Sequence, residues 1–295
     1  MKKHALVLAA GKGTRMRTEL PKCAYPILKK PIIEYIVEKI ERTTIDDIVV
    51  VVGHQKEVLQ DILKDRVKYA HQKEQLGTGH AALSAADVLE QEEGITFILP
   101  GDMPLMDFRL MDKILLAHEE MGNDLTVVSM MFDHPKGYGR IVRDKYNNIH
   151  SIVEDNDCND IQKQIKEVNS GVYVINNKYL FQTLRKIEIN VRKGEYYLTD
   201  IVELMRHDYK VGSFLVRKSY MMMGVNDLHQ ISIAEKYLRD EINTNHMLSG
   251  VAIINPETVT IGHNVVIEEG VIIHPNTTIT GESIIKSKAE IGPNT

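Results

Sequence analysis

A short apolar strand that runs directly into a glycine-rich, basic loop constrains the fold of this chain more than any other feature. The predicted strand spans residues 4–9, the loop GKGTR follows at residues 11–15, and LPK follows at residues 20–22. In α/β proteins such a junction presents backbone N–H groups and cations to a phosphate chain. The junction therefore predicts an α/β fold built around a nucleotide.

The loop matches neither of two common phosphate-binding patterns. A Walker A loop has Ser or Thr after Gly-Lys, whereas Gly13 follows Lys12 here, and Met16 occupies the third glycine position of the dinucleotide pattern. The loop alone leaves a phosphate site and an ordinary turn both open. Lys22 follows Pro21 and favours a phosphate site, because its ammonium group can lie over a triphosphate. The alternative for Lys22 is an ordinary surface lysine.

Composition excludes several classes of protein. The 295 residues carry a net charge of -5, which argues against a general nucleic-acid binder. The N-terminal apolar run is too short for a signal peptide and no run has transmembrane length, so we expect a cytoplasmic protein without a membrane partner. Cys23 and Cys158 are expected to be free thiols, and the scattered histidines indicate no transition-metal site.

Strand and helix patterns alternate over residues 4–130, which predicts a doubly wound, mainly parallel sheet. Ligands of such sheets bind beyond the carboxyl ends of the strands. Gly11, Gly53 and Asp102 each follow a predicted strand, so we expect them to share one edge. The predicted strands span 4–9, 48–52, 67–70, 96–99 and 125–132, and the predicted helices begin at Pro31 or span 55–63, 79–89 and 110–118.

Residues 135–225 are less regular and predict an insertion that closes over the sheet. A tight turn is expected at 137–140, and strands are expected at 141–142 and 172–175. Residues 228–241 have apolar residues at helical spacing and predict a connector helix.

Isoleucine recurs at a fixed period near the C-terminus. It occupies every sixth position, at 261, 267, 273, 279, 285 and 291, with Gly and Asn between. This period is typical of a hexapeptide β-helix, whereas a plain antiparallel segment does not explain the regular spacing. About two turns are present, so we expect either a naturally short chain or a fragment of a longer one. The predicted division is 1–227, 228–249 and 250–295.

Several polar candidates are ambiguous on their own. Gln72 offers a donor and an acceptor to a base edge, and Thr78 either contacts a ligand or caps a helix. Asp102 at a strand end could hold Mg²⁺ together with substrate phosphates, or could form a turn. Isolated polar residues beside apolar strands or glycine, each of which could be a turn residue, are Glu154, Asn169 and Asn226.

Taken together, the motifs resemble one bacterial enzyme family. LAAGKGTRM and LPK are followed in order by QLGTGHA, PGDMPL, GYGRI, IVE, EVNSGVY, GEYYLTDIV and GVND, and then by the period-six repeats. This order is similar to that of the bifunctional N-acetylglucosamine-1-phosphate uridylyltransferases, which also carry a glucosamine-1-phosphate acetyltransferase domain. The first motif is shared by many sugar nucleotidyltransferases, whereas QLGTGHA with GYGR, EYYLTD and GVND is more specific.

The resemblance implies a fold, a reaction and roles for individual residues. The fold is a nucleotidyltransferase domain at 1–227 followed by a connector helix and a truncated left-handed parallel β-helix. UTP and N-acetylglucosamine 1-phosphate would give UDP-N-acetylglucosamine, a cell-wall precursor, and pyrophosphate. The implied catalytic residues are Arg15, Lys22 and Asp102, and Mg²⁺ would be held by Asp102 and Asn226. The implied substrate contacts are Leu8, Ala9, Ala10 and Gly11 with uridine, Gln72 and Gly77 with uracil, Arg15 and Lys22 with phosphates, and Thr78, Gly139, Glu154 and Asn169 with the amino sugar.

Three alternatives remain open at this point. One is another sugar-1-phosphate nucleotidyltransferase. A second is an acyltransferase, suggested by the hexapeptide repeats, or a fragment of the full bifunctional enzyme that also acetylates. The positions that match the family's acetyltransferase site and most of its trimer surface do not occur in these 295 residues. A third is a non-catalytic nucleotide-sugar sensor, which would not need Lys22, Asp102 and Asn226 together.

Overall fold

The chain divides into two units. A computed structural model describes residues 1–11 and 13–295, and Lys12 of the glycine-rich loop lies outside them. The first unit comprises Met1–Ala24 and Ile33–Gly224, and the second comprises Tyr25–Ile32 and Val225–Thr295. A short N-terminal segment therefore belongs with the C-terminal part of the chain.

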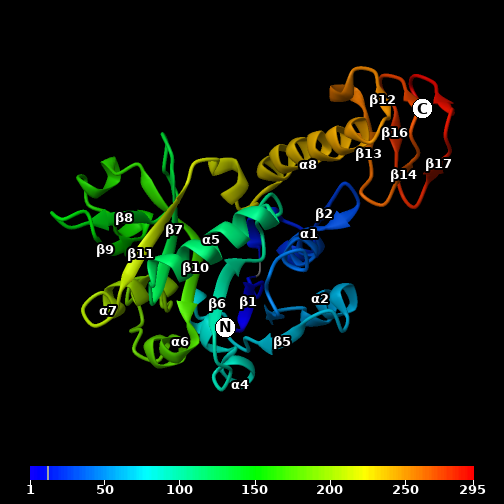
Figure 1. Ribbon diagram of the computed structural model, residues 1–295. Helices are drawn as coiled ribbons and strands as arrows, with labels where there is room; N and C mark the ends of the chain where they lie inside the picture. The colour runs from blue at the N-terminus through cyan, green and yellow to red at the C-terminus, as the bar shows by residue number, and fades with distance from the viewer. Residues whose placement is uncertain (12) are drawn as a thin grey trace. The chain divides into compact units, whose positions relative to one another are not determined.

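The first unit is built on a mainly parallel sheet, as predicted. Its main strands are β1 (Lys3–Leu8), β4 (Asp47–Val52), β5 (Lys68–His71), β6 (Ile95–Pro100), β7 (Leu125–Met131), β10 (Glu167–Asn176) and β11 (Val211–Val216). They lie in the order β11-β7-β10-β6-β1-β4-β5 (Figure 1). β1 is parallel to β4 and β6, whereas β10 runs antiparallel to both β6 and β7.

Helices of the first unit connect and cover these strands. They are α1 (Ile32–Ile40), α2 (Lys56–Leu63), α3 (Thr78–Leu83), α4 (Ala86–Leu89), α5 (Phe108–Met121), α6 (Asn177–Leu184) and α7 (Ile201–Met205). The single helix predicted at 79–89 is wrong, because it is divided into α3 and α4. The Ser84 hydroxyl donates to the His80 carbonyl at 2.9 Å, and such back-bonding to the preceding turn bends helices. Pro31 lies in a short strand, so α1 begins one residue later than predicted.

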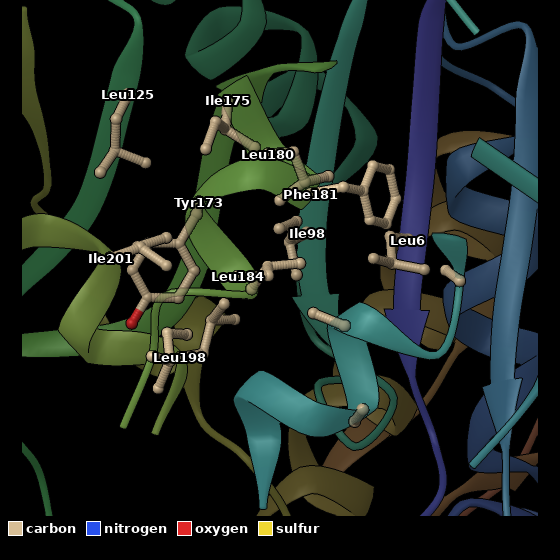
Figure 2. Close-up of a cluster of buried hydrophobic side chains, with 14 of the residues drawn as sticks. Leu6, Ile98, Leu125, Tyr173, Ile175, Leu180, Phe181, Leu184, Leu198 and Ile201 are labelled. Atoms are coloured by element: carbon tan, nitrogen blue, oxygen red, sulfur yellow. The ribbon is translucent and has the colours of Figure 1, made fainter. Parts of the chain in front are cut away.

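The core of the first unit contains aliphatic and aromatic side chains from the sheet and from α6. Figure 2 shows Leu180, Phe181 and Leu184 of α6 pointing into the cluster that includes Leu6 and Ile98. All five of these side chains are buried. Their burial stabilises β1 and β6 at the centre of the sheet.

The expectation that residues 135–225 form an insertion over the sheet is wrong. β10 and β11 belong to the sheet itself, and only β8 (Arg140–Arg143) and β9 (Ile149–Val153) lie off its main path within the described residues. A register shift between Asn169 and Tyr173 interrupts β10. This irregularity hides the first half of β10 from a search for uninterrupted apolar runs.

The second unit contains a long helix, one pair of short antiparallel strands and a series of short parallel strands. α8 (Leu228–Leu248) extends beyond the predicted 228–241, and the buried Asn243 amide donates to the carbonyls of Pro256 and Val259, both at 2.9 Å. The short strands are β2 (Pro26–Ile27), β3 (Lys30–Pro31), β12 (Ala252–Ile253), β13 (Thr260–Ile261), β14 (Val266–Ile267), β15 (Ile272–Ile273), β16 (Thr278–Ile279), β17 (Ile284–Ile285) and β18 (Glu290–Ile291). β13, β14 and β15 each pair in parallel with the strand three further on.

The period-six isoleucines point into one apolar cluster. Ile261 and Ile273 are fully buried there, and Ile285 and Ile291 pack against the same cluster. The fixed period therefore corresponds to one inward side chain in each short strand. Within the described part of the chain, no helix has both the length and the apolar character needed to cross a membrane.

Candidate functional site

The ends of β1, β4 and β6 meet at one edge of the sheet. Leu8 pairs with Val51 of β4 on one side and with Pro100 of β6 on the other. Gly53 follows β4 so closely against Ala10 that an added Cβ would lie 2.7 Å from the Ala10 carbonyl oxygen. The prediction that the residues after these three strands share one edge is therefore confirmed.

The turn after β1 lies between the ends of its two neighbours. Ala9 N–H donates to the Val51 carbonyl at 3.0 Å, and Gly101 N–H donates to the Leu8 carbonyl at 2.9 Å. Gly11 is exposed, and an added Cβ there would meet nothing within 4 Å. Open space at Gly11 leaves the backbone accessible to a ligand.

Lys22 lies against the glycine-rich loop and pairs with Asp102. A Cβ on Gly13, whose φ is +61°, would lie 2.5 Å from the Cβ of Lys22. The Lys22 ammonium donates to Asp102 Oδ2, and each of the two side chains is 14% exposed. Arg15 lies in the short 3-10 helix Thr14–Met16 and is exposed. Lys22 and Asp102 thus lie together at the edge where the strands end, and Arg15 lies in the glycine-rich loop that Lys22 contacts.

Cys23 lies next to this ion pair but does not take part in chemistry at the surface. It is buried, and burial together with the Asp102 charge raises the pKa of its thiol to about 12. A thiol that stays protonated is a poor nucleophile and metal ligand. Cys23 therefore fits the expectation of a free, structural cysteine.

The segment that follows β5 is fixed by a second, distant segment. Gly77 has φ +104°, and an added Cβ would lie 2.5 Å from the Tyr196 carbonyl oxygen. The Tyr196 N–H donates to the Leu76 carbonyl at 2.7 Å, and the Gly79 N–H donates to the Tyr196 carbonyl at 2.8 Å. The exposed Thr78 accepts from Leu198 N–H at 3.0 Å. We call residues 8–11 and 72–78 together the parallel-strand side of the site.

Three predicted residues meet where β8, β9 and β10 come together. Asn169 N–H donates to the Gly139 carbonyl at 2.8 Å, and an added Cβ on Gly139 would lie 3.6 Å from Glu154 Oε1. The Thr199 hydroxyl donates to the same Glu154 oxygen at 3.4 Å. Burial raises the pKa of Glu154, and the nearby Asp200 raises it further. We call Gly139, Glu154, Asn169 and residues 195–200 the antiparallel-strand side.

The irregularity in β10 places Asn169 at this position. The Asn169 amide donates to the Tyr173 hydroxyl at 2.7 Å and accepts from Gly171 N–H at 3.1 Å. Gly171 has φ +82°, and an added Cβ would lie 3.1 Å from Pro100 at the end of β6. Because β10 is antiparallel to β6, its first half lies beside the end of β6 that carries Asp102. The antiparallel-strand side therefore adjoins the Lys22–Asp102 pair.

Sequence reasoning missed four residues that the structure adds to this side. The Tyr138 phenol has its pKa raised by burial and by the charge of Asp102, which places it in the field of that carboxylate. Burial of Tyr173 raises its pKa. Thr199 contacts Glu154, and burial raises the pKa of Asp200 to about 6. Tyr138, Thr199 and Asp200 lie in the GYGR and EYYLTD motifs, which were the available signal.

The predicted metal pair stays a prediction. Asp102 belongs to the first unit, whereas Asn226 belongs to the second, where its backbone N–H donates to the Gln230 side chain at 2.7 Å before α8 begins. Within residues 1–11 and 13–295, no three His, Cys, Asp or Glu side chains are grouped so that they could hold a metal ion.

The chain belongs to the nucleotidyl transferase family, whose model matches residues 4–231. Two similar proteins are each called "Bifunctional protein GlmU". The protein of Acholeplasma laidlawii is 57% identical over all of this chain and 64% of its own length. The protein of Thermoanaerobacter pseudethanolicus is 44% identical over 98% of this chain and 63% of its own length. The chain thus spans a little under two thirds of these relatives.

A solved structure supports the fold. The crystal structure of a UDP-glucose pyrophosphorylase complexed with UDP-glucose covers 82% of this chain with a TM-score of 0.66. All of that chain is covered, at 19% sequence identity. The nucleotidyltransferase type of α/β domain is therefore shared.

Proposed function

We propose that this chain transfers the uridylyl group of UTP to N-acetylglucosamine 1-phosphate and releases pyrophosphate. The observation that carries the proposal is the Lys22–Asp102 pair at the end of β6. β6 lies between β1 and β10, so the parallel-strand side and the antiparallel-strand side flank this pair. Residues 195–200 bond to both sides, through Thr78 and Glu154. Family membership and the relatives named GlmU support the same reaction class.

The parallel-strand side suits a nucleotide because it offers backbone groups and little side-chain bulk. We assign Leu8, Ala9, Ala10 and Gly11 to the uridine, since their backbone leaves the sheet where ligands of this fold bind. Gln72 and Gly77 are assigned to the uracil edge. Arg15 and Lys22 are assigned to the phosphates, whose charge two cations can offset.

The antiparallel-strand side suits an amino sugar because it offers hydrogen-bonding side chains in a half-buried setting. We assign Gly139, Glu154 and Asn169 of this side to the sugar, together with Thr78 of the parallel-strand side, which accepts from Leu198 N–H. A carboxylate accepts from hydroxyl groups, an amide both donates and accepts, and Gly139 leaves room beside Glu154. Thr199 and Tyr173 hold the Glu154 and Asn169 side chains by hydrogen bonds.

The proposed reaction needs positioning and charge neutralisation rather than a strong base. An oxygen of the sugar phosphate, already anionic, forms a bond to the α-phosphorus of UTP. The bond from that phosphorus to the β-phosphate oxygen breaks in line, and pyrophosphate leaves with the electron pair. Arg15 and Lys22 offset the negative charge of the reacting phosphates, and the two sides hold the reactants in line.

The residues around Asp102 fit Mg²⁺. The carboxylate already has a cation, the Lys22 ammonium, at Oδ2. A Cβ on Gly224 would lie 3.3 Å from Oδ1, so a side chain at this position would crowd that oxygen. Mg²⁺ commonly binds one or two protein oxygens together with substrate phosphates. We therefore propose Asp102 as a residue that would hold Mg²⁺, which when bound would offset phosphate charge; Asn226 as a ligand stays what the resemblance implies.

The proposal extends to the organisation of the chain. We propose residues 1–227 as the nucleotidyltransferase domain, 228–249 as a connector helix and 250–295 as the first coils of a left-handed parallel β-helix. The parallel pairing of strands 18 residues apart, as in Thr260 with Thr278, supports coils of three hexads. A homotrimer through a longer β-helix belongs to the same proposal.

Pyrophosphate release from every combination of nucleoside triphosphate and sugar 1-phosphate tests the function. We expect turnover with UTP and N-acetylglucosamine 1-phosphate, and loss of turnover when Mg²⁺ is chelated. Faster turnover with glucose 1-phosphate would instead identify another sugar nucleotidyltransferase. Binding of UDP-N-acetylglucosamine without any turnover would identify a sensor.

A further inference from the structure

We infer that His80 is a positioning residue that orients the amide of Gln72 and so selects uracil over cytosine. The inference rests on the proposed function, because it concerns the base of the nucleotide. Gln72 is 3% exposed and follows β5. Its orientation is therefore set by protein partners rather than by bulk water.

Both hydrogens of the Gln72 amide nitrogen are directed to protein acceptors. Nε2 donates to the Gly77 carbonyl at 3.1 Å and lies 3.1 Å from Nδ1 of His80. A carbonyl can only accept, so the contact with Gly77 identifies the nitrogen of the amide. Nδ1 of His80 then accepts the second hydrogen, which puts the imidazole proton on Nε2.

The two acceptors are themselves fixed. Gly77 is held by its left-handed backbone against Tyr196, and Gly79 N–H donates to the Tyr196 carbonyl at 2.8 Å. His80 lies in α3, where its carbonyl accepts from the Ser84 hydroxyl at 2.9 Å. Within the part of the chain that the structure describes, Oε1 of Gln72 accepts no hydrogen bond. That oxygen is the atom left for a ligand.

An amide that presents only its oxygen discriminates between the two pyrimidines. N3–H is the one ring donor of uracil in a nucleotide, and it can donate to Oε1. Cytosine has a lone pair at N3, so its N3 would face the Gln72 oxygen without a hydrogen. Accepting cytosine would require the amide to turn over, which would place Oε1 against the Gly77 carbonyl and, in the Nε2–H tautomer that the present arrangement favours, against the lone pair of His80 Nδ1.

Removing the His80 acceptor leaves Gly77 alone to resist that rotation. The loss of one hydrogen bond of this kind corresponds to about 3- to 10-fold in relative affinity. His80→Phe keeps a ring of similar size but has no acceptor. In His80→Asn, the side-chain oxygen can occupy the place of Nδ1, so this variant should restore the bond.

The test compares UTP with CTP on the full 295-residue chain, with N-acetylglucosamine 1-phosphate and Mg²⁺ present. We expect His80→Phe to narrow the UTP/CTP ratio of kcat/KM by about 3- to 10-fold, chiefly through KM. His80→Asn should return the ratio toward that of the wild type. His80→Leu provides a second acceptor-free variant if His80→Phe does not fold.

His71→Phe is the matched control. His71 and His80 line the same cavity of about 230 Å³, and His71 is not hydrogen-bonded to Gln72 in the described structure. The same substitution there should leave the ratio unchanged. An unchanged ratio in both acceptor-free variants would overturn the inference, as would a wild type that prefers CTP.

Calorimetric binding of UTP and CTP separates this inference from the proposed function. A wild type without turnover refutes the function, while the effect of His80 on the ratio of the two dissociation constants still decides the inference. A wild type that binds neither nucleotide refutes both.

Discussion

The two sides of the site offer a ligand different kinds of groups. The parallel-strand side consists of strand ends and glycines, and it exposes backbone through open space at Gly11 and a left-handed conformation at Gly77. The antiparallel-strand side consists of single residues from separate segments of the chain, among which burial raises the pKa of Glu154 and of Asp200. The comparison indicates that recognition through backbone depends on strand ends and glycines, with Gly77 held against the distant Tyr196, whereas recognition through carboxylates depends also on burial and on pH.

The largest expected effect is at the residue between the two sides. Asp102→Asn should lower kcat/KM for both substrates by about a hundredfold or more, the scale of losing a transition-state electrostatic contact. Initial rates of pyrophosphate release at varied UTP and sugar phosphate measure this effect. A change confined to one substrate would contradict the position of Asp102 between the two sides, since Asp102 would then act on one substrate only.

Asp107→Ala separates loss of chemistry from loss of fold. Asp107 caps α5, because its side chain accepts from Arg109 N–H at 2.8 Å. Its removal should cost about 1 kcal/mol of stability and leave turnover per folded molecule unchanged.

Glu154→Gln should act on one substrate. The variant keeps the shape of the side chain but removes its charge, and a hydrogen bond to an ionised group contributes about 1.5–3 kcal/mol. We expect KM for the sugar phosphate to rise about 10- to 100-fold, with little change in KM for UTP. Equal increases in both would show that Glu154 supports the fold rather than the sugar.

Glu167→Gln is the comparison for that measurement. Glu167 lies on β10 and bonds to Arg143 and to Ser129, each at 2.7 Å. The same substitution at Glu167 should lower stability without a selective effect on the sugar phosphate.

Two glycine substitutions test which glycine of the parallel-strand side supports the fold and which contacts the nucleotide. Gly77→Ala should reduce the free energy of unfolding by about 1–3 kcal/mol, because φ is +104° and its Cβ would lie 2.5 Å from the Tyr196 oxygen. Gly11→Ala should leave stability unchanged, since its Cβ meets nothing within 4 Å, but should raise KM for UTP. Thermal unfolding and UTP kinetics on both variants make the comparison. Unchanged UTP kinetics in Gly11→Ala would remove Gly11 from the nucleotide contacts.

The smallest expected effect is a pH dependence from Asp200. Burial raises its pKa from 3.8 to about 6, so the folded state favours the protonated form. The stabilisation is fully present below pH 3.8 and is lost as the pH rises through about 6. Asp200→Asn should therefore raise the free energy of unfolding at pH 7 by about 1 kcal/mol, allowing for water around this half-buried group, and by little near pH 4.

Urea unfolding between pH 4 and pH 7 measures this difference. Asp160→Asn, at an exposed position, should show no such trend. A constant difference between wild type and Asp200→Asn across that range would mean that ionisation of Asp200 does not affect stability.

Much of the parallel-strand side could be predicted from the sequence. The apolar strand before Gly11, the β-branched run before Gly53 and the strand before Asp102 are contiguous patterns, and parallel strands bring their ends together by geometry alone. The period-six isoleucines likewise predict the short C-terminal strands, because the inward position recurs every six residues along the chain. The interruption of β10 at Asn169 breaks such a pattern, so the sequence predicts a strand at 172–175 but not the first half of β10.

Local sequence determined where the strands end, which turns need glycine and which repeat forms the C-terminal strands, because each depends on neighbouring residues. Folding in three dimensions was needed to establish that Thr199 bonds to Glu154, that Tyr196 fixes Gly77, and that the Gln72 amide donates toward His80. Except for the short contact between Gln72 and His80, these partners are separated by dozens of residues. Even there, the orientation of a buried amide follows from the acceptors that surround it in space.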